Sequence, residues 1–425
     1  MASKFEFIIN IILILSLMGA GLPLWRLISG FSYKPNEGDA LQRNILLVGY
    51  ILALLPIILY PKRFRVLVFS VPLIWLLITW AALSIFWSGS PSLALRRIIA
   101  ILLTTSYALV LYMRFPFASF LRLLGLAFFI AIFISILIAV IKPEWGTTYY
   151  DQTSVWRGVF DHKNTFGKVS SISFLFFTHL WSLNKKLRDR FFWGSAIILS
   201  IIAIIKSNSV TALVTSIIIA TGTMLIKISR PWQKVWQFFI LFIVLIGIGV
   251  GLLVIQNNEI LFDILGREVT LTGRTELWRL LIPMGFKRLW IGYGFRTFWL
   301  GWDGPSANIY SLLRWMPTHG HNGFLDTFLE LGLIGLGMGI VLIVKTLFAN
   351  LRSAFFGSVE GRFWVLFCLS FITYNFAESE LLRINSILWV MLVYAYLSVK
   401  LKRSNFSHIV VKKGSDINYD TLHLA

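Results

Sequence analysis

The sharpest chemical signal in the sequence is a pair of histidines two positions apart, His319 and His321, followed directly by Asn322. An imidazole with a pKa near 6.5 can accept a proton from a hydroxyl at neutral pH. An apolar run, 323–348, comes next, and as a helix it would be about 39 Å long, whereas the hydrocarbon core measures roughly 30 Å. We therefore expect its first turns to stand above a bilayer, with His321 in a wet cavity at the membrane face.

Carboxylates continue this pattern into the apolar run. Asn322, Asp326 and Glu330 recur every four residues and share one face of a helix. A carboxylate at or below the interface is costly unless paired, so Glu330 is expected to face the protein interior. Three glycines on the same run fit close helix packing: Gly332, Gly335 and Gly339.

A second polar stretch, 156–167, contains Arg157, His162, Lys163 and Asn164 just before another apolar run. The planar fork of an arginine can bind two phosphate oxygens at once, and a helix N-terminus nearby also favours an anion. This composition indicates a phosphate-binding site. The alternative is an ordinary capped helix entry with solvated charges.

Arg274 stands in a third stretch, 272–278, and a Gly-Tyr-Gly sequence at 292–294 indicates a tight turn or a close backbone approach. Arg274 is a second candidate phosphate ligand. Lys287 and Arg288, beside Trp290, are better explained as contacts with phospholipid headgroups.

Metal and nucleotide chemistry have little support. The chain has six histidines, one cysteine and no His-Glu-x-x-His sequence, so a complete metal-ligand set is hard to assemble and we expect no catalytic metal. Neither a Walker A nor a Rossmann fingerprint is present, and no cofactor is expected.

The composition places these residues in a membrane protein. Of the 425 residues, 57% are hydrophobic and only 14% are charged, far from the balance of a soluble domain. The net charge of +20 does not indicate nucleic-acid binding, because the basic residues lie in short segments between apolar runs, as they do in membrane proteins. We predict an all-α integral membrane protein with about twelve transmembrane helices. The predicted spans are 5–28, 44–60, 66–87, 98–113, 121–141, 166–183, 191–206, 210–227, 235–255, 323–348, 363–377 and 384–400.

Lysine and arginine in the short loops orient these spans. Basic loops alternate with more acidic ones, which predicts that both termini are cytoplasmic and that the three polar stretches face outward. The predicted organisation is nine spans in 1–255, a long extracytoplasmic loop with short amphipathic helices at 256–322, three spans in 323–400, and a cytoplasmic tail at 401–425. The first span is expected to be retained, although cleavage as a signal peptide is an alternative.

The three stretches, in this order, resemble the O-antigen ligase and polysaccharide polymerase (Wzy-like) superfamily. The His-Asn-x9-Gly-x-x-Gly pattern from His321 to Gly335 is similar to the family's ligase motif, and the stretch at 156–167 is more like the ExoQ-type exopolysaccharide polymerase branch. The resemblance covers roughly residues 70–400.

This resemblance implies a metal-independent, GT-C-like glycosyltransferase in the bacterial inner membrane. Its donor would be a glycan on undecaprenyl pyrophosphate, and its other partners a glycan acceptor, the bilayer and other polysaccharide export proteins. By similarity, Arg157 and Arg274, aided by Lys163, would hold the pyrophosphate and His321 would act on the acceptor hydroxyl. His162, Asn164, His319, Asn322 and Glu330 would support them.

Three alternatives stay open at this point. A ligase would transfer the glycan to lipid A–core, whereas a polymerase would extend a lipid-linked chain. A small-anion transporter belongs to another class, but no paired repeat of the kind common in transporters is visible. A lipid-linked glycan flippase should carry charges deep along several helices, and most spans here have none.

Overall fold

The computed structural model describes residues 4–20, 40–150, 153–228, 272–313 and 315–401. The N-terminal half is a series of helices with one small hairpin. Its elements are α1 (Lys4–Leu17), α3 (Ala40–Leu54), α4 (Pro56–Leu59), α5 (Pro61–Ser70), α6 (Pro72–Leu83), η1 (Ser84–Trp87), α7 (Pro91–Arg114), α8 (Phe117–Ile141), α9 (Pro143–Gly146), β1 (Thr147–Tyr150), β2 (Thr153–Trp156), α10 (Lys163–Leu183), α11 (Leu187–Ser207) and α12 (Val210–Ile228).

The second half holds the remaining helices, which are α15 (Thr272–Lys287), η2 (Gly301–Asp303), α16 (Ala307–Tyr310), α17 (Gly323–Phe355), α18 (Val359–Ala377) and α19 (Ile387–Lys400). The all-α expectation holds apart from one antiparallel hairpin, in which Thr147 pairs with Trp156. The predicted span 235–255, the end of the first span, the start of the long loop and nearly all of the tail lie outside the described residues.

Within the described ranges, five helices are long and apolar enough to cross a membrane. They are Gln42–Leu59, Pro91–Arg114, Phe117–Ile141, Leu187–Ser207 and Gly323–Phe355. A bent pair of helices would make six. The chain is thus a helical membrane protein, and the expected number of about twelve spans is not confirmed.

The predicted span 66–87 is not one continuous helix. Two helices, α5 and α6, occupy this region and meet at an angle of 82°. The break falls at Val71, whose φ of −123° and ψ of 52° are not helical. Val71 precedes Pro72, and the proline ring disfavours a helical conformation in the residue before it.

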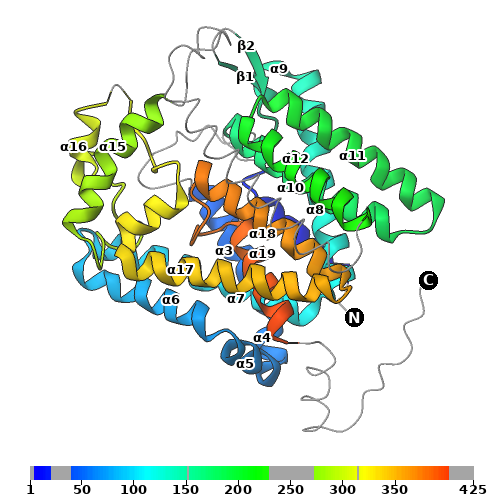
Figure 1. Ribbon diagram of the computed structural model, residues 1–425, viewed down its shortest axis with the longest axis horizontal. Coiled ribbons are helices and arrows are strands. Elements are labelled where there is room, and N and C mark those ends of the chain that lie inside the picture. The colour runs from blue at the N-terminus through cyan, green and yellow to red at the C-terminus, as the bar shows by residue number, and fades with distance from the viewer. Residues whose placement is uncertain (1–3, 21–39, 151–152, 229–271, 314, 402–425) are drawn as a thin grey trace.

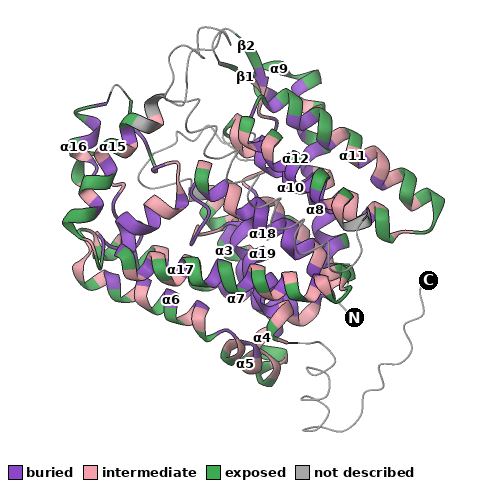
Figure 2. Cartoon of the chain, in the orientation of Figure 1, coloured by how far each residue is buried: buried purple, intermediate pink, exposed green. Residues whose placement is uncertain are grey.

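Three helices form the centre of the molecule, α10, α18 and α19 (Figure 1). Figure 2 shows buried residues concentrated there, and α10 packs against α8, α11, α12 and α18. The buried serines of α10 bond to its own backbone, as Ser170 does to the Phe166 carbonyl at 2.7 Å. A helix enclosed by protein does not need an apolar surface, which explains why α10 carries more polar residues than the helices around it.

Residues 272–313 form a helical cap of α15, η2 and α16, at one side of the molecule beside α17 (Figure 1). The cap has its own hydrophobic core, which includes Leu277, Leu281, Phe298 and Ile309 and is completed by Leu329 of α17. Packing against α17 therefore fixes the position of the cap.

Gly332 interrupts α17, which the sequence predicted to be continuous. Its φ of 66° and ψ of −169° are outside the helical region. The carbonyls released by the break bond to the cap instead: Leu329 accepts from the Tyr293 amide at 2.8 Å and Glu330 from the Gly294 amide at 2.9 Å. A Cβ at Gly332 would lie 2.2 Å from backbone atoms of Trp290, so only glycine fits this crossing.

Substituting Gly332 by alanine should therefore destabilise the protein. The new Cβ meets backbone, and the strained φ alone costs about 1–3 kcal/mol. We expect a clearly lower melting temperature in detergent for Gly332→Ala, measured by a thermal-shift assay.

Gly337→Ala is the matched control on the same helix, because nothing lies within 4 Å of a Cβ at Gly337. An unchanged melting temperature in Gly332→Ala would show that the crossing tolerates a side chain and that the tight contact is not a constraint.

Candidate active site

Glu378 lies at the centre of the polar residues that the sequence singles out. It follows the C-terminus of α18, and its side chain is 14% exposed. One carboxylate oxygen, Oε1, accepts from Asn164 Nδ2 at 3.2 Å and lies 3.8 Å from Arg274 Nη2. The other, Oε2, lies 3.0 Å from His319 Nε2 and 3.8 Å from His321 Nδ1. One carboxylate therefore joins the start of α10, the start of α15 and the loop before α17.

The histidine loop is held in place by Asp326, one turn into α17. Both oxygens of this carboxylate accept from the Gly320 amide, at 2.9 and 3.0 Å, and Trp299 Nε1 donates to it at 2.9 Å. Ser379, the neighbour of Glu378, also donates to Asp326. Asp326 thus connects the loop to the segment that carries Glu378.

His321 itself adopts the left-handed conformation, with φ of 50°. A non-glycine residue there is under strain of about 1–3 kcal/mol, and such strain persists only where the surroundings enforce it. The next residue, Asn322, caps α17 by accepting from the amides of Phe324 and Leu325 at 3.0 and 3.1 Å. The side chain of Asn322 therefore supports the site by starting the helix.

The two histidines differ in their hydrogen bonds, although their ring centroids are 4.0 Å apart. His319 is engaged at both nitrogens, with Thr318 Oγ1 3.1 Å from Nδ1 and Glu378 on Nε2. His321 makes no hydrogen bond to the described residues, and its Nδ1 is buried. Because Nδ1 faces Glu378 at 3.8 Å, Nε2 is the nitrogen of His321 that could meet a substrate.

The stretch before α10 contributes unequally to this cluster. His162 caps α10, where its Nδ1 accepts from the Asn164 amide at 3.1 Å, and Asn164 reaches Glu378. Lys163 begins α10. Arg157 does not join the cluster: its Nε donates to the Thr147 carbonyl of the hairpin at 3.2 Å, its one side-chain hydrogen bond within the described ranges.

Glu330 also lies apart from Glu378. It is buried in the last turn before the Gly332 break, and the basic residues whose charges act on it are Arg296 and Arg97. The three residues that share this helix face therefore have different roles. Asn322 caps the helix, Asp326 holds the histidine loop, and Glu330 interacts with two arginines near the cap.

A second buried ion cluster fixes the loop between α18 and α19. Glu380 is fully buried and pairs with Lys168 of α10, while Arg383 Nη1 and Ser386 Oγ donate to it at 2.9 and 3.0 Å. Because Glu380 is two residues from Glu378, this cluster determines where Glu378 stands relative to α10.

Glu378 and His321 differ in their charge at neutral pH. Burial works against ionisation of Glu378, but its contacts with His319 and His321 hold its pKa well below the usual range. Burial lowers the pKa of His321, and the charges of His319 and Arg274 add to this effect while Glu378 opposes it. At neutral pH the site therefore combines a carboxylate, a permanent cation on Arg274 and a neutral imidazole on His321.

Three residues of the cluster could also hold a metal ion. Ligand atoms of His319, His321 and Glu378 all lie within 4.8 Å of one another, a donor set found at catalytic zinc. The argument from sequence that ligands are hard to assemble is therefore wrong. Two features work against a cation: Arg274 approaches Glu378, and His319 already bonds to it. The absence of a catalytic metal stays a prediction.

Glu378 is the site residue that the sequence analysis did not identify. It lies in a short segment between two apolar runs, far along the chain from the three polar stretches. One signal in the sequence could have identified it. Two carboxylates, Glu378 and Glu380, lie two positions apart between apolar runs, where each needs a cation or a hydrogen-bond donor.

Comparison with known proteins agrees with the motifs. The family model described as O-antigen ligase matches residues 195–340, which include Arg274 and both loop histidines. The chain is 26% identical over 360 residues to the exopolysaccharide production protein ExoQ of Rhizobium meliloti (strain 1021), covering 79% of this chain and 77% of that protein. The resemblance to the O-antigen ligase and polysaccharide polymerase superfamily, on its ExoQ-type side, is confirmed.

Replacing Glu378 by glutamine should alter both the rate and its pH dependence. The lost orientation of His319 and Arg274 should lower kcat/KM by up to about 10²-fold. Removal of the negative charge also removes the effect that raises the pKa of His321. The acidic limb of the pH profile, where activity falls as the base is protonated, should therefore move to lower pH.

The matched control is Glu144→Gln, which neutralises an exposed carboxylate on α9. A reduced rate in Glu378→Gln with an unmoved acidic limb would mean that Glu378 does not act on the titrating base.

Proposed function

We propose that this protein is an inner-membrane glycosyltransferase of the GT-C type that polymerises oligosaccharide repeats carried on undecaprenyl pyrophosphate. The reaction would take place at the outer face, in exopolysaccharide or O-antigen synthesis. The observation that carries the proposal is the convergence of Arg274 and His321 at Glu378, in a chain similar to ExoQ. A cation for a phosphate and a base for a hydroxyl are the two groups that this transfer requires.

The chemistry is a single displacement at the anomeric carbon of the donor. The acceptor hydroxyl oxygen forms the new glycosidic bond, the bond to the pyrophosphate oxygen breaks, and undecaprenyl pyrophosphate leaves with the electron pair. His321 takes the hydroxyl proton, and Arg274 offsets the negative charge on the leaving group. Because pyrophosphate is a good leaving group, positioning and charge stabilisation carry most of the catalysis.

The two histidines would have different roles. His319 is held by Thr318 and Glu378, so it positions the loop, whereas His321 would meet the acceptor through Nε2 while its buried Nδ1 faces Glu378. The lowered pKa of His321 favours the neutral form that accepts a proton. Asn164, itself bonded to Glu378, would support this arrangement from α10.

Arg157 and Lys163 would bind the pyrophosphate together with Arg274. Arg157 contacts only a neutral carbonyl, and a charged phosphate oxygen is a stronger acceptor for a guanidinium. Arg157 would therefore exchange its bond to Thr147 for one to the donor. The transfer would need no metal, because Arg274 and its basic neighbours supply the positive charge.

Ligation is the second candidate, and the description of the matched family model favours it. A ligase would use the same donor and the same residues and would transfer the glycan to lipid A–core. The acceptor separates the two functions: a polymerase extends a lipid-linked repeat, and a ligase does not. Similarity to an exopolysaccharide production protein supports polymerisation.

The proposed topology places both termini in the cytoplasm and the cap outside. Asp303 is exposed on the cap. We expect the Asp303→Cys variant to react with an impermeant thiol reagent in intact spheroplasts, as followed by a gel-shift assay. The single native cysteine, Cys368, is buried and should give little background.

The control is Lys62→Cys, an exposed position in a predicted cytoplasmic segment, which should react only after lysis. The opposite labelling pattern would invert the topology and place the site on the cytoplasmic face.

His321→Ala should reduce transfer by about 10²–10⁴-fold, the usual effect of losing a positioned base. His319→Ala should be less severe, because it removes an orienting group. The assay follows purified protein with a lipid-linked repeat as donor, and supplies a second lipid-linked repeat or lipid A–core as acceptor.

Two controls accompany this measurement. Wild-type activity should survive EDTA, whereas loss that Zn²⁺ restores would assign His319, His321 and Glu378 to a metal. Transfer by His321→Ala at the wild-type rate would place the base elsewhere.

A further inference from the structure

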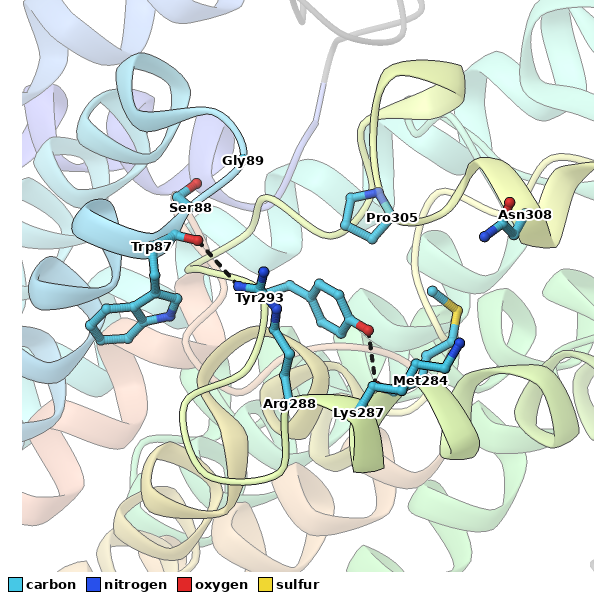
Figure 3. Close-up of a pocket in the computed structure, with 9 residues that line it drawn as sticks. All are labelled: Trp87, Ser88, Gly89, Met284, Lys287, Arg288, Tyr293, Pro305 and Asn308. Atoms are coloured by element: carbon cyan, nitrogen blue, oxygen red, sulfur yellow. Dashed lines mark hydrogen bonds between the residues drawn. The ribbon is translucent and has the colours of Figure 1, made fainter.

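A cavity of about 330 Å³ lies outside the Glu378 cluster, between the cap and the connection from α6 to α7. Figure 3 shows Trp87 on one side, and Arg288, Lys287, Met284 and Tyr293 along the other. Its volume falls within the range of about 300–1,000 Å³ that is usual for small-molecule sites.

Hydrogen bonds hold the walls of this cavity in place. Arg288 Nη1 donates to the Trp87 carbonyl at 3.4 Å, and its guanidinium lies 5.2 Å from the centre of the Tyr293 ring. The Tyr293 hydroxyl donates to the Met284 carbonyl at 3.1 Å, and Trp87 Nε1 to the Ile291 carbonyl at 3.1 Å. The arginine is therefore fixed against an aromatic ring.

The lining has a definite chemical character. Two cations, Lys287 and Arg288, stand beside the aromatic side chains of Trp87 and Tyr293 and the amide of Asn308, and no acidic residue lines the cavity. Aromatic rings suit the apolar face of a sugar ring, and an amide suits its hydroxyls. The two cations select a ligand that also carries a negative charge, such as a carboxylate.

Helix α15 connects this cavity to the proposed active site. Arg274 lies in its first turn and Lys287 at its end, so thirteen residues at 1.5 Å each separate them by about 20 Å. The histidine loop lies beside the middle of the helix, where Trp278 Nε1 donates to the Gly320 carbonyl at 2.7 Å. Lys287 follows Trp278 by nine residues, about 14 Å of helix, so the cavity lies beside the proposed site and is separate from it. A distant part of the same oligosaccharide could occupy the cavity.

We propose that this cavity is a binding subsite for an acidic sugar of the glycan chain, at the end of α15 opposite Arg274. The choice of a saccharide as ligand rests on the proposed function. The Tyr293 ring and the Asn308 amide beside the two cations favour a sugar over a phospholipid headgroup, which needs only exposed cations at the membrane surface. Arg288 and Lys287 set the specificity for charge.

The test measures binding without turnover, so a failure of the transfer reaction would not affect it. The probes are a tetrasaccharide of glucose and glucuronic acid and its carboxyl-reduced neutral counterpart, titrated calorimetrically into the full-length protein in detergent. Wild type should bind the acidic probe about tenfold more tightly than the neutral one, as expected for one charged contact. Lys287→Gln and Arg288→Gln should each lose this preference.

Arg279→Gln is the matched control, because Arg279 is exposed on the same helix and does not line the cavity. Lys287→Gln guards against misfolding of the Arg288 variant, because Arg288 is tied to the Trp87 carbonyl and the Tyr293 ring, whereas Lys287 is the last residue of α15. Equal wild-type affinity for the two probes would overturn the proposal. Loss of phosphatidylglycerol binding in the variants, with saccharide binding intact, would also overturn it by assigning the cavity to a lipid headgroup.

Discussion

A buried negative charge at Glu378 is the interaction on which the proposed site depends. A carboxylate removed from water is costly unless cations and donors surround it. Here the partners come from α10, from α15 and from the loop before α17, so movement of any one of these segments would remove part of the compensation for the charge of Glu378. Compensating one charge thus assembles residues that lie more than 200 positions apart in sequence.

The surroundings extend this constraint in two directions. On one side, Glu380 and Lys168 anchor the Glu378 loop to the centre of the bundle. On the other, Asp326 ties the histidine loop to α17 and to Ser379. His321 lies between these anchors in a strained backbone conformation and with a lowered pKa. Its suitability as a base follows from how firmly its neighbours are held.

Much of this arrangement could be predicted from local pattern. The start of α17 at Gly323 and the polar stretches that begin α10 and α15 follow from residue types and spacing. Glu378 could not be found in this way, because its importance comes from contacts across the fold. The hydrogen bond from Arg157 to the Thr147 carbonyl of the hairpin could not be predicted either, because it also depends on the folded structure. The break before Pro72 could have been predicted, because a proline disfavours a helical conformation in the residue before it. The continuous apolar run at 66–87 favoured a single helix instead.

The crossing at Gly332 has a mechanical consequence. The cap is bonded to α17 on both sides of the crossing: the Leu329 and Glu330 carbonyls accept from it before Gly332, and the Leu333 amide donates to the Leu289 carbonyl at 2.8 Å after it. The cap and α17 are therefore clamped together at this point. A force on the cap would be passed along α17 to the helices that pack against it, α18 and α19, instead of bending the loop that Asp326 holds.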